Sequence, residues 1–344
     1  MRSRVRRGAF GFGVALVGLS AIGATYQAIA AVRDREAYPP PGQMVDMGGY
    51  RLHLQVAGAA QRGPTVILDA GIASFSPHWH WVQTEIANTA RVVAYDRAGL
   101  GWSDPGPGPN DVQQSARELH AALAIAGIEG PYVVAGHSYG GLVSRAFADL
   151  YPDEVVGMVL VDASHPDQWA RIPEALGGRL VALSNRVLGL LAGVGLIRII
   201  DPITPQTATG LPAQQFAEMK AIFALPKTWS TSSAALSSWD TQTRAQIDGA
   251  SQMGNLPLVV LSVTEQAQYA NTLTELQSEL PALSTNSIHR TIQGATHENL
   301  IANVEHARFV AAAIYQVLEA ARTGQPLSAR PNSRVEARTA DAWG

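Results

Sequence analysis

Short apolar runs rich in β-branched residues alternate along this chain with longer segments of helical periodicity, and this alternation restricts the possible folds. The runs expected to be strands are 51–57, 65–70, 91–96, 132–136, 156–162, 256–263 and 287–294. Most of them are apolar at nearly every position, which indicates strands buried on both faces. Segments between them, such as 111–126, 140–150 and 302–320, repeat apolar residues every three or four positions. We therefore predict an α/β fold with a mostly parallel sheet flanked by helices.

The alternation breaks once, between residues 166 and 255, where helical patterns such as 183–200 and 212–225 follow one another without a strand pattern. We expect this segment to be a helical lid inserted between two parts of the core, 45–165 and 256–322. From residue 323 to 344 no apolar periodicity remains, and we expect a disordered tail.

The N-terminal residues 1–36 are predicted to anchor the protein in a membrane. Gly8 to Val32 contains no charged side chain, and as a helix it would span about 37 Å, enough for a hydrocarbon core of about 30 Å. The four arginines before it and the mixed charges after it favour a cytoplasmic N-terminus and place the bulk of the chain outside the cytoplasm. One alternative is a signal peptide cleaved after Ala28-Ile29-Ala30, which would release a secreted protein. The other is a buried core helix.

Residues 37–44 are expected to be a stiff linker, because three successive prolines favour extended polyproline geometry and would hold the domain away from the anchor.

Charge and composition exclude several classes of partner and cofactor. The formal net charge is −3 although residues 2–7 carry four arginines, so the remainder is clearly acidic and unlike a general nucleic-acid binder. The chain has no cysteine, hence no disulfide framework and no thiolate metal ligand. We expect no metal, because no spacing of histidines and acids resembles a ligand set, and no cofactor, because no phosphate-binding glycine loop is present. The membrane is thus an expected partner and nucleic acid is not; the oligomeric state is left open.

The segment Gly136-His137-Ser138-Tyr139-Gly140 has the form G-x-S-x-G between a predicted strand and a predicted helix. Such a turn displays a serine hydroxyl as a nucleophile, and glycines on either side remove side chains that would collide at the sharp bend. Ser138 would lie at a helix N-terminus, whose dipole favours developing negative charge. The simpler alternative is an ordinary strand-to-helix turn in which Ser138 only caps the helix.

A serine hydroxyl needs a base, and in this architecture an acid and then a histidine follow the serine in the chain. His297, in "QGATHENL" after the last predicted strand, is the expected base. Two strand ends offer an acid: Asp162, which we favour, and Glu265, which remains the alternative. For the oxyanion we expect two backbone N–H donors, from Tyr139 and from Ile72 in the loop after strand 65–70.

These motifs together resemble the α/β-hydrolase fold superfamily over residues 45–320, and in particular its serine hydrolases and esterases. The resemblance implies that the sheet is of the eight-stranded type. "LDAGIASFS", "YDRAGLGWSDPGP", "VVAGHSYGGL", "VLVDASHPDQ" and "GATHENLI" follow the order of the family. The resemblance implies that the loop of Asp96 and Arg97 braces the site rather than reacting. Two departures stand out: Ala70-Gly71 replaces a frequent His-Gly, and the usual aspartate after strand 256–263 is missing. The second departure resembles the branch, including haloalkane dehalogenase relatives, that takes its acid from the preceding strand end, where Asp162 lies.

The sequence thus predicts a serine hydrolase that cleaves a carboxylic ester through an acyl-enzyme. The lid stretch 187–197 has no charge, which favours an apolar acyl group or a small hydrophobic substrate. The alternatives are a membrane-anchored ligand-binding protein without turnover, and another chemistry on the same fold, such as that of an amidase or a lyase.

Overall fold

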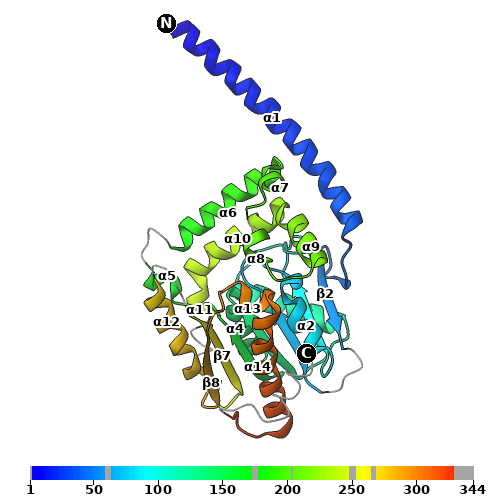
Figure 1. The fold of residues 1–344 in the computed structure, drawn as a ribbon, viewed down its shortest axis with the longest axis vertical. Helices are drawn as coiled ribbons and strands as arrows, with labels where there is room; N and C mark the ends of the chain where they lie inside the picture. The colour runs from blue at the N-terminus through cyan, green and yellow to red at the C-terminus, as the bar shows by residue number, and fades with distance from the viewer. Residues whose placement is uncertain are drawn as a thin grey trace.

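A computed structural model describes residues 2–58, 63–172, 177–202, 204–247, 253–264 and 269–328. Within these residues one eight-stranded sheet has the order β1-β2-β4-β3-β5-β6-β7-β8 (Figure 1). The strands are β1 Gln43–Asp46, β2 Arg51–Ala57, β3 Thr65–Asp69, β4 Val92–Asp96, β5 Tyr132–His137, β6 Val155–Val161, β7 Leu258–Val263 and β8 Ser287–Ile292. Only the pairs β1–β2 and β2–β4 are antiparallel, so the predicted mostly parallel sheet is confirmed.

The helices comprise a long N-terminal one, those that cover the sheet, and those inserted between β6 and β7. The first two groups are α1 Arg2–Ala37, η1 Ser76–Trp79, α2 His80–Ile86, α3 Val112–Ile125, α4 Tyr139–Leu150, α12 Ala270–Glu279, η5 Leu280–Leu283, α13 Asn299–Ala302 and α14 Val304–Thr323. The inserted group is α5 Gln168–Arg171, α6 Gly178–Gly193, α7 Leu196–Ile200, α8 Thr204–Thr207, α9 Ala213–Phe223, α10 Pro226–Ser238, the π-helix η3 Trp239–Thr243 and α11 Arg244–Ile247.

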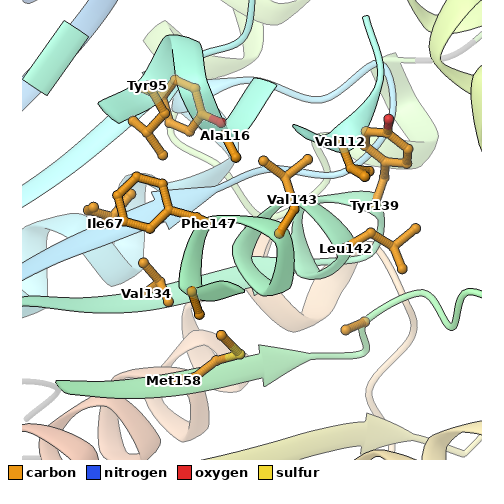
Figure 2. Packing of buried hydrophobic residues seen from close by; sticks show 14 of the residues in the cluster. Ile67, Tyr95, Val112, Ala116, Val134, Tyr139, Leu142, Val143, Phe147 and Met158 are labelled. Atoms are coloured by element: carbon orange, nitrogen blue, oxygen red, sulfur yellow. The ribbon is translucent and has the colours of Figure 1, made fainter. Parts of the chain in front are cut away.

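Two apolar cores lie on the two faces of the sheet. Helices α3 and α4 cover one face, where Phe147 of α4 packs among Ile67, Val134 and Met158 of three parallel strands (Figure 2). Helices α2 and α14 cover the other face and contact each other. Strands such as β3, β5 and β7 are buried at every position, which is why the sequence shows continuous rather than alternating apolar runs.

Between β6 and β7 the described residues form helices joined by turns, and no strand. The lid helices α6, α7, α9 and α10 lie together at one end of the molecule, beside α1 (Figure 1). Helices α6 and α10 pack against each other, and a separate apolar cluster joins this group to Phe75 of the loop after β3. The lid is therefore packed against the carboxyl-terminal edge of the sheet.

Strand β1 and the close contact of α1 with the lid were not expected. β1 falls at the end of the predicted linker; it is a four-residue edge strand paired with β2, too short to show a pattern of its own. The linker does not hold the domain away from α1, because side chains near the end of α1 hydrogen-bond to the lid and the backbone oxygen of Tyr38 accepts from Trp102 Nε1 at 2.9 Å.

The chain termini bear on two further predictions. Among the described residues one helix, Val14–Ala37, is long and apolar enough to cross a membrane. It is almost entirely exposed, which argues against a buried core helix. At the other end α14 continues to Thr323, and residues 329–344 of the predicted tail lie outside the described residues.

Candidate active site

The predicted nucleophile lies on a tight turn from β5 into α4. Ser138 adopts φ 53° and ψ −124°, a left-handed conformation that is strained for a residue with a side chain. A Cβ on Gly136 would lie 2.4 Å from the backbone oxygen of Gly140, and one on Gly140 would lie 2.3 Å from that of Asp69. The turn therefore requires glycine at both positions, as predicted, and Ser138 stands at the end of the central strand with its side chain half-buried.

His297 and Asp162 meet although they are far apart in the sequence. His297 Nδ1 lies 2.5 Å from Asp162 Oδ2. Asp162 follows β6 in a left-handed conformation with φ 43°, and its side chain is 4% exposed. The second carboxylate oxygen, Oδ1, accepts from the backbone N–H of Val263 at 3.2 Å. Both oxygens are thus held, and the carboxylate fixes the orientation of the His297 ring. Glu265, the alternative acid, lies outside the described residues.

His137, the residue before Ser138, holds His297 beside the turn. Its ring lies 4.5 Å from the His297 ring, centroid to centroid, and its Nε2 donates to the backbone oxygen of His297 at 2.9 Å. Burial, and next the neighbouring His297, set the pKa of His137 well below its ordinary value, so this ring stays neutral. The sequence analysis missed this role, although a polar residue inside a buried elbow signals a hydrogen bond.

The loop after β3 packs directly against the nucleophile. A Cβ on Gly71 would lie 3.1 Å from Ser138 Cβ and 3.5 Å from its Oγ. This contact brings the loop residue that follows, Ile72, to the edge of the site. Tyr139 begins α4, and the N–H of a first helical residue has no acceptor in its own helix. The two predicted oxyanion donors therefore belong to segments that both adjoin Ser138.

Arg97 holds the loop after β3 in place through hydrogen bonds. Its guanidinium donates to the Asp69 carboxylate, to the backbone oxygen of Ala70 at 2.5 Å and to that of Gly71, and it lies over the Tyr139 ring at 5.4 Å. Burial raises the pKa of Asp69, and the charge of Arg97 opposes that rise. Asp69 was missed in the sequence, where the only signal was an acid at the end of the apolar run "VILDA".

Asp96 has different partners from Arg97. Its carboxylate accepts from the backbone N–H groups of Ser76 at 2.7 Å and Trp102 at 2.9 Å and contacts the ring of His53 at 2.9 Å. The two residues of the predicted bracing pair therefore hold different segments, and they do not pair with each other. His53 is fully buried.

The comparisons agree with this architecture. The sequence model of the α/β hydrolase fold family matches residues 64–198, the part that contains the turn and its bracing loops. Solved structures covering most of the chain share the fold, among them a thermophilic esterase from Thermogutta terrifontis, with a TM-score of 0.61 and 21% identity over 82% of this chain and 99% of that one. The chain therefore has the α/β-hydrolase fold.

Further solved structures and relatives show how far the similarity extends. The epoxide hydrolase CorEH has a TM-score of 0.63 and 16% identity, covering 80% of this chain and 98% of that one. The uncharacterized protein YqjL of Bacillus subtilis is 30% identical over 116 residues, which are 33% of this chain and 46% of that protein. The chain thus matches less than half the length of the first curated relatives.

One cluster in this α/β-hydrolase fold has the geometry of metal ligands. Within the part of the chain that is described, His137, His297 and Glu298 each offer a ligand atom, all within 4.8 Å of one another. No spacing in the sequence indicated this cluster, because residues 137 and 297 are distant along the chain. His297 already contacts Asp162 through Nδ1 and His137 already donates from Nε2, so both rings are oriented by protein groups.

Proposed function

We propose that this protein is a serine hydrolase that cleaves a carboxylic ester through an acyl-enzyme intermediate. The observation that carries the proposal is the 2.5 Å contact between His297 and Asp162, beside a strained serine on a strand-to-helix turn. A buried carboxylate bonded to one imidazole nitrogen keeps the proton there and leaves the other nitrogen able to accept a proton. That is the requirement for activating a hydroxyl at neutral pH.

In the proposed cycle, Ser138 Oγ attacks the ester carbonyl while His297 takes its proton. The tetrahedral oxyanion is held by the N–H groups of Ile72 and Tyr139, each worth on the order of a hundredfold in rate. His297 then gives the proton to the leaving alcohol as the bond to it breaks. Water, deprotonated by the same imidazole, attacks the acyl-Ser138 carbonyl and releases the acid.

The chemistry of the nucleophile favours an ester over an epoxide, although epoxide hydrolases are among the structures of similar fold. A serine oxygen that opened an epoxide would form an ether, and water attacks an ether far less readily than an ester. An acyl-serine has a carbonyl that water can attack with the same base and the same oxyanion donors. Ser138 therefore supports turnover of an ester and not of an epoxide.

The proposal includes attachment to a membrane through α1, with the catalytic domain outside the cytoplasm. Four arginines precede the apolar stretch, which favours a cytoplasmic N-terminus. A continuous helix also carries Gln27 and Asp34 into hydrogen bonds with the domain. Cleavage of the chain after Ala30 would remove the first of these contacts, so they favour an uncleaved anchor. The apolar lid favours a hydrophobic substrate.

A fluorophosphonate probe, followed by peptide mapping, tests the nucleophile and its activation in one step. We expect labelling on Ser138 and turnover of a chromogenic ester, and both should be lost in Ser138→Ala. Ser184→Ala is the matched control, since this exposed serine lies on α6 and donates only to the backbone oxygen of Val181. If the wild-type protein is not labelled by the probe and does not hydrolyse the ester but still binds an apolar ligand, the enzyme proposal is refuted. The ligand-binding alternative would then hold.

A further inference from the structure

Helix α1 is joined to the tip of the lid by close contacts. A Cβ on Gly23 would lie 2.4 Å from the backbone oxygen of Val194, so the helix and the turn between α6 and α7 touch backbone to backbone. Arg198 of α7 donates to Gln27 at 3.0 Å and to Asp34 at 2.5 Å. The tip of the lid therefore lies beside residues 23–34 of α1.

These contacts also limit where a hydrocarbon core can end along α1. The Arg198 guanidinium and the Asp34 carboxylate are charged and cannot lie in hydrocarbon without a large cost. A span from Gly8 to Tyr26 has about 19 residues and a length of about 28 Å, close to the thickness of a bilayer core. Tyr26 is 47% exposed, and an aromatic side chain is favoured at that boundary. The lid tip, in contact with Gly23, then lies at the outer surface of the membrane.

The lid presents an apolar surface at this level. Seven large apolar side chains of α6 and α7 are exposed to solvent: Leu180 48%, Leu183 55%, Val187 47%, Leu190 74%, Leu196 37%, Ile199 69% and Ile200 54%. The four on α6 are spaced by three or four residues and so share one helix face. Ala182, Asn185 and Ala192 are buried instead, on the side that packs against α10.

The direction of α6 and its charges suit the same surface. In Figure 1 α6 runs crosswise to α1, so that it lies along the membrane when α1 crosses it. Helix α6 carries two arginines, Arg179 and Arg186, and no acid, and arginines beside an apolar helix face favour lipid phosphates. An interfacial helix with this composition buries its apolar face at the boundary between headgroups and acyl chains.

We propose that the exposed apolar face of α6 and α7 is seated in the outer leaflet of the same bilayer that α1 spans. The occupant of this face is lipid, because the anchor brings the membrane to it. The inference rests on the membrane anchoring proposed above and adds a second point of contact. The mouth of the lid then adjoins the acyl chains, a source from which an apolar ester can enter.

The absence of cysteine in the chain permits single-cysteine labels in the full-length protein. Leu190→Cys and Ile199→Cys report on the lid, Val17→Cys on the span, and Ile125→Cys at the end of α3, 59% exposed, is the matched control on the core. Each is labelled with an environment-sensitive fluorophore after reconstitution into phosphatidylcholine–phosphatidylglycerol vesicles. Quenching by a lipid with a nitroxide near its headgroup is compared with quenching by aqueous iodide.

We expect lipid quenching several-fold stronger at positions 190 and 199 than at 125, with iodide quenching in the opposite order. Lid labels that iodide quenches as fully as position 125 would overturn the inference, since the face would then be in water. Labels shielded from both quenchers would also overturn it, because a protein surface would cover the face. A Val17→Cys label that aqueous iodide quenches as fully as position 125 would refute the anchor itself, so the two proposals fail separately.

Discussion

Replacing Asp162 by asparagine tests the central contact of the site with almost no change in shape. The carboxylate has two acceptor oxygens, one for His297 Nδ1 at 2.5 Å and one for Val263 N–H at 3.2 Å. An asparagine has one acceptor oxygen and one amide donor. If its oxygen keeps the bond to Val263, the NH₂ group faces His297 and forces the ring proton onto the nitrogen that should activate Ser138.

The expected loss follows from that wrong tautomer. In a serine protease the corresponding change lowers kcat about 10⁴-fold, which is a barrier increase of about 5 kcal/mol. Because Asp162 is only 4% exposed, water cannot replace the lost interaction, and we expect the full effect here. The unfolding free energy should change by only about 1 to 2 kcal/mol, since one hydrogen bond remains.

The assay compares kcat/KM on a chromogenic ester with the rate of fluorophosphonate labelling, and both should fall together. Asp167→Asn is the matched control, because this aspartate forms ion pairs with Arg171 and Arg244. An Asp162→Asn enzyme within tenfold of wild type, with His297→Ala inactive, would refute the reasoning. A large loss in Glu265→Gln instead would assign the acid to that residue.

Three further changes probe the bracing of the site and one buried histidine, His78 of η1. Gly71→Ala adds a Cβ 3.1 Å from Ser138 Cβ. We expect kcat to fall about tenfold or more, since a small displacement of a nucleophile is costly in catalysis. The melting temperature measured by calorimetry should stay close to that of the wild type. Arg97→Met should lower the unfolding free energy by about 3 to 5 kcal/mol in denaturant titrations, because it leaves the Asp69 carboxylate buried and unpaired; adding Asp69→Asn should recover part of that loss, and no recovery would contradict the ion-pair account. Burial lowers the pKa of His78 to about 4, so protonation favours the unfolded chain. The free energy of unfolding therefore falls as pH drops from about 6.5 towards 4, by about 2 kcal/mol at pH 5. His78→Gln should flatten this dependence in unfolding curves at pH 7.5 and 5, and an equal slope in both proteins would exclude His78 as a cause.

Strong local patterns made the fold predictable from the sequence. Strands β3 and β5 are continuous apolar runs, and the structure places them within one residue of the expected bounds. The G-x-S-x-G turn was equally predictable, because glycine at positions 136 and 140 is required by backbone atoms nearby in the chain or in the neighbouring strand. Strand β1 lacked such a signal, since its four residues are defined only by pairing with β2.

Contacts between distant segments were harder to foresee. The neutral His137 donates to a residue 160 positions away, and no local pattern marks that bond. The proline-rich segment 37–44 was expected to separate anchor and domain, since polyproline geometry is extended. The position of α1 against the domain is instead set by hydrogen bonds from Arg198 to Gln27 and Asp34. Arg198 follows these two residues by 171 and 164 positions in the chain.

The position of the acid shows why the sequence left two alternatives. Asp162 lies at the end of β6, yet its Oδ1 accepts from the N–H of Val263 at the end of β7. The two strands are neighbours and parallel, so their carboxyl ends open on the same space. A carboxylate from either end can therefore reach an imidazole placed above them. In the sequence the two strand ends are about a hundred residues apart. In the fold, the left-handed conformation of Asp162, with φ 43°, turns its side chain towards the neighbouring end of β7. The prediction that follows is that Asp162→Gly combined with an acid at position 263 or 264 should restore part of the labelling of Ser138, and complete inactivity of every such variant would show that the position at β6 is required.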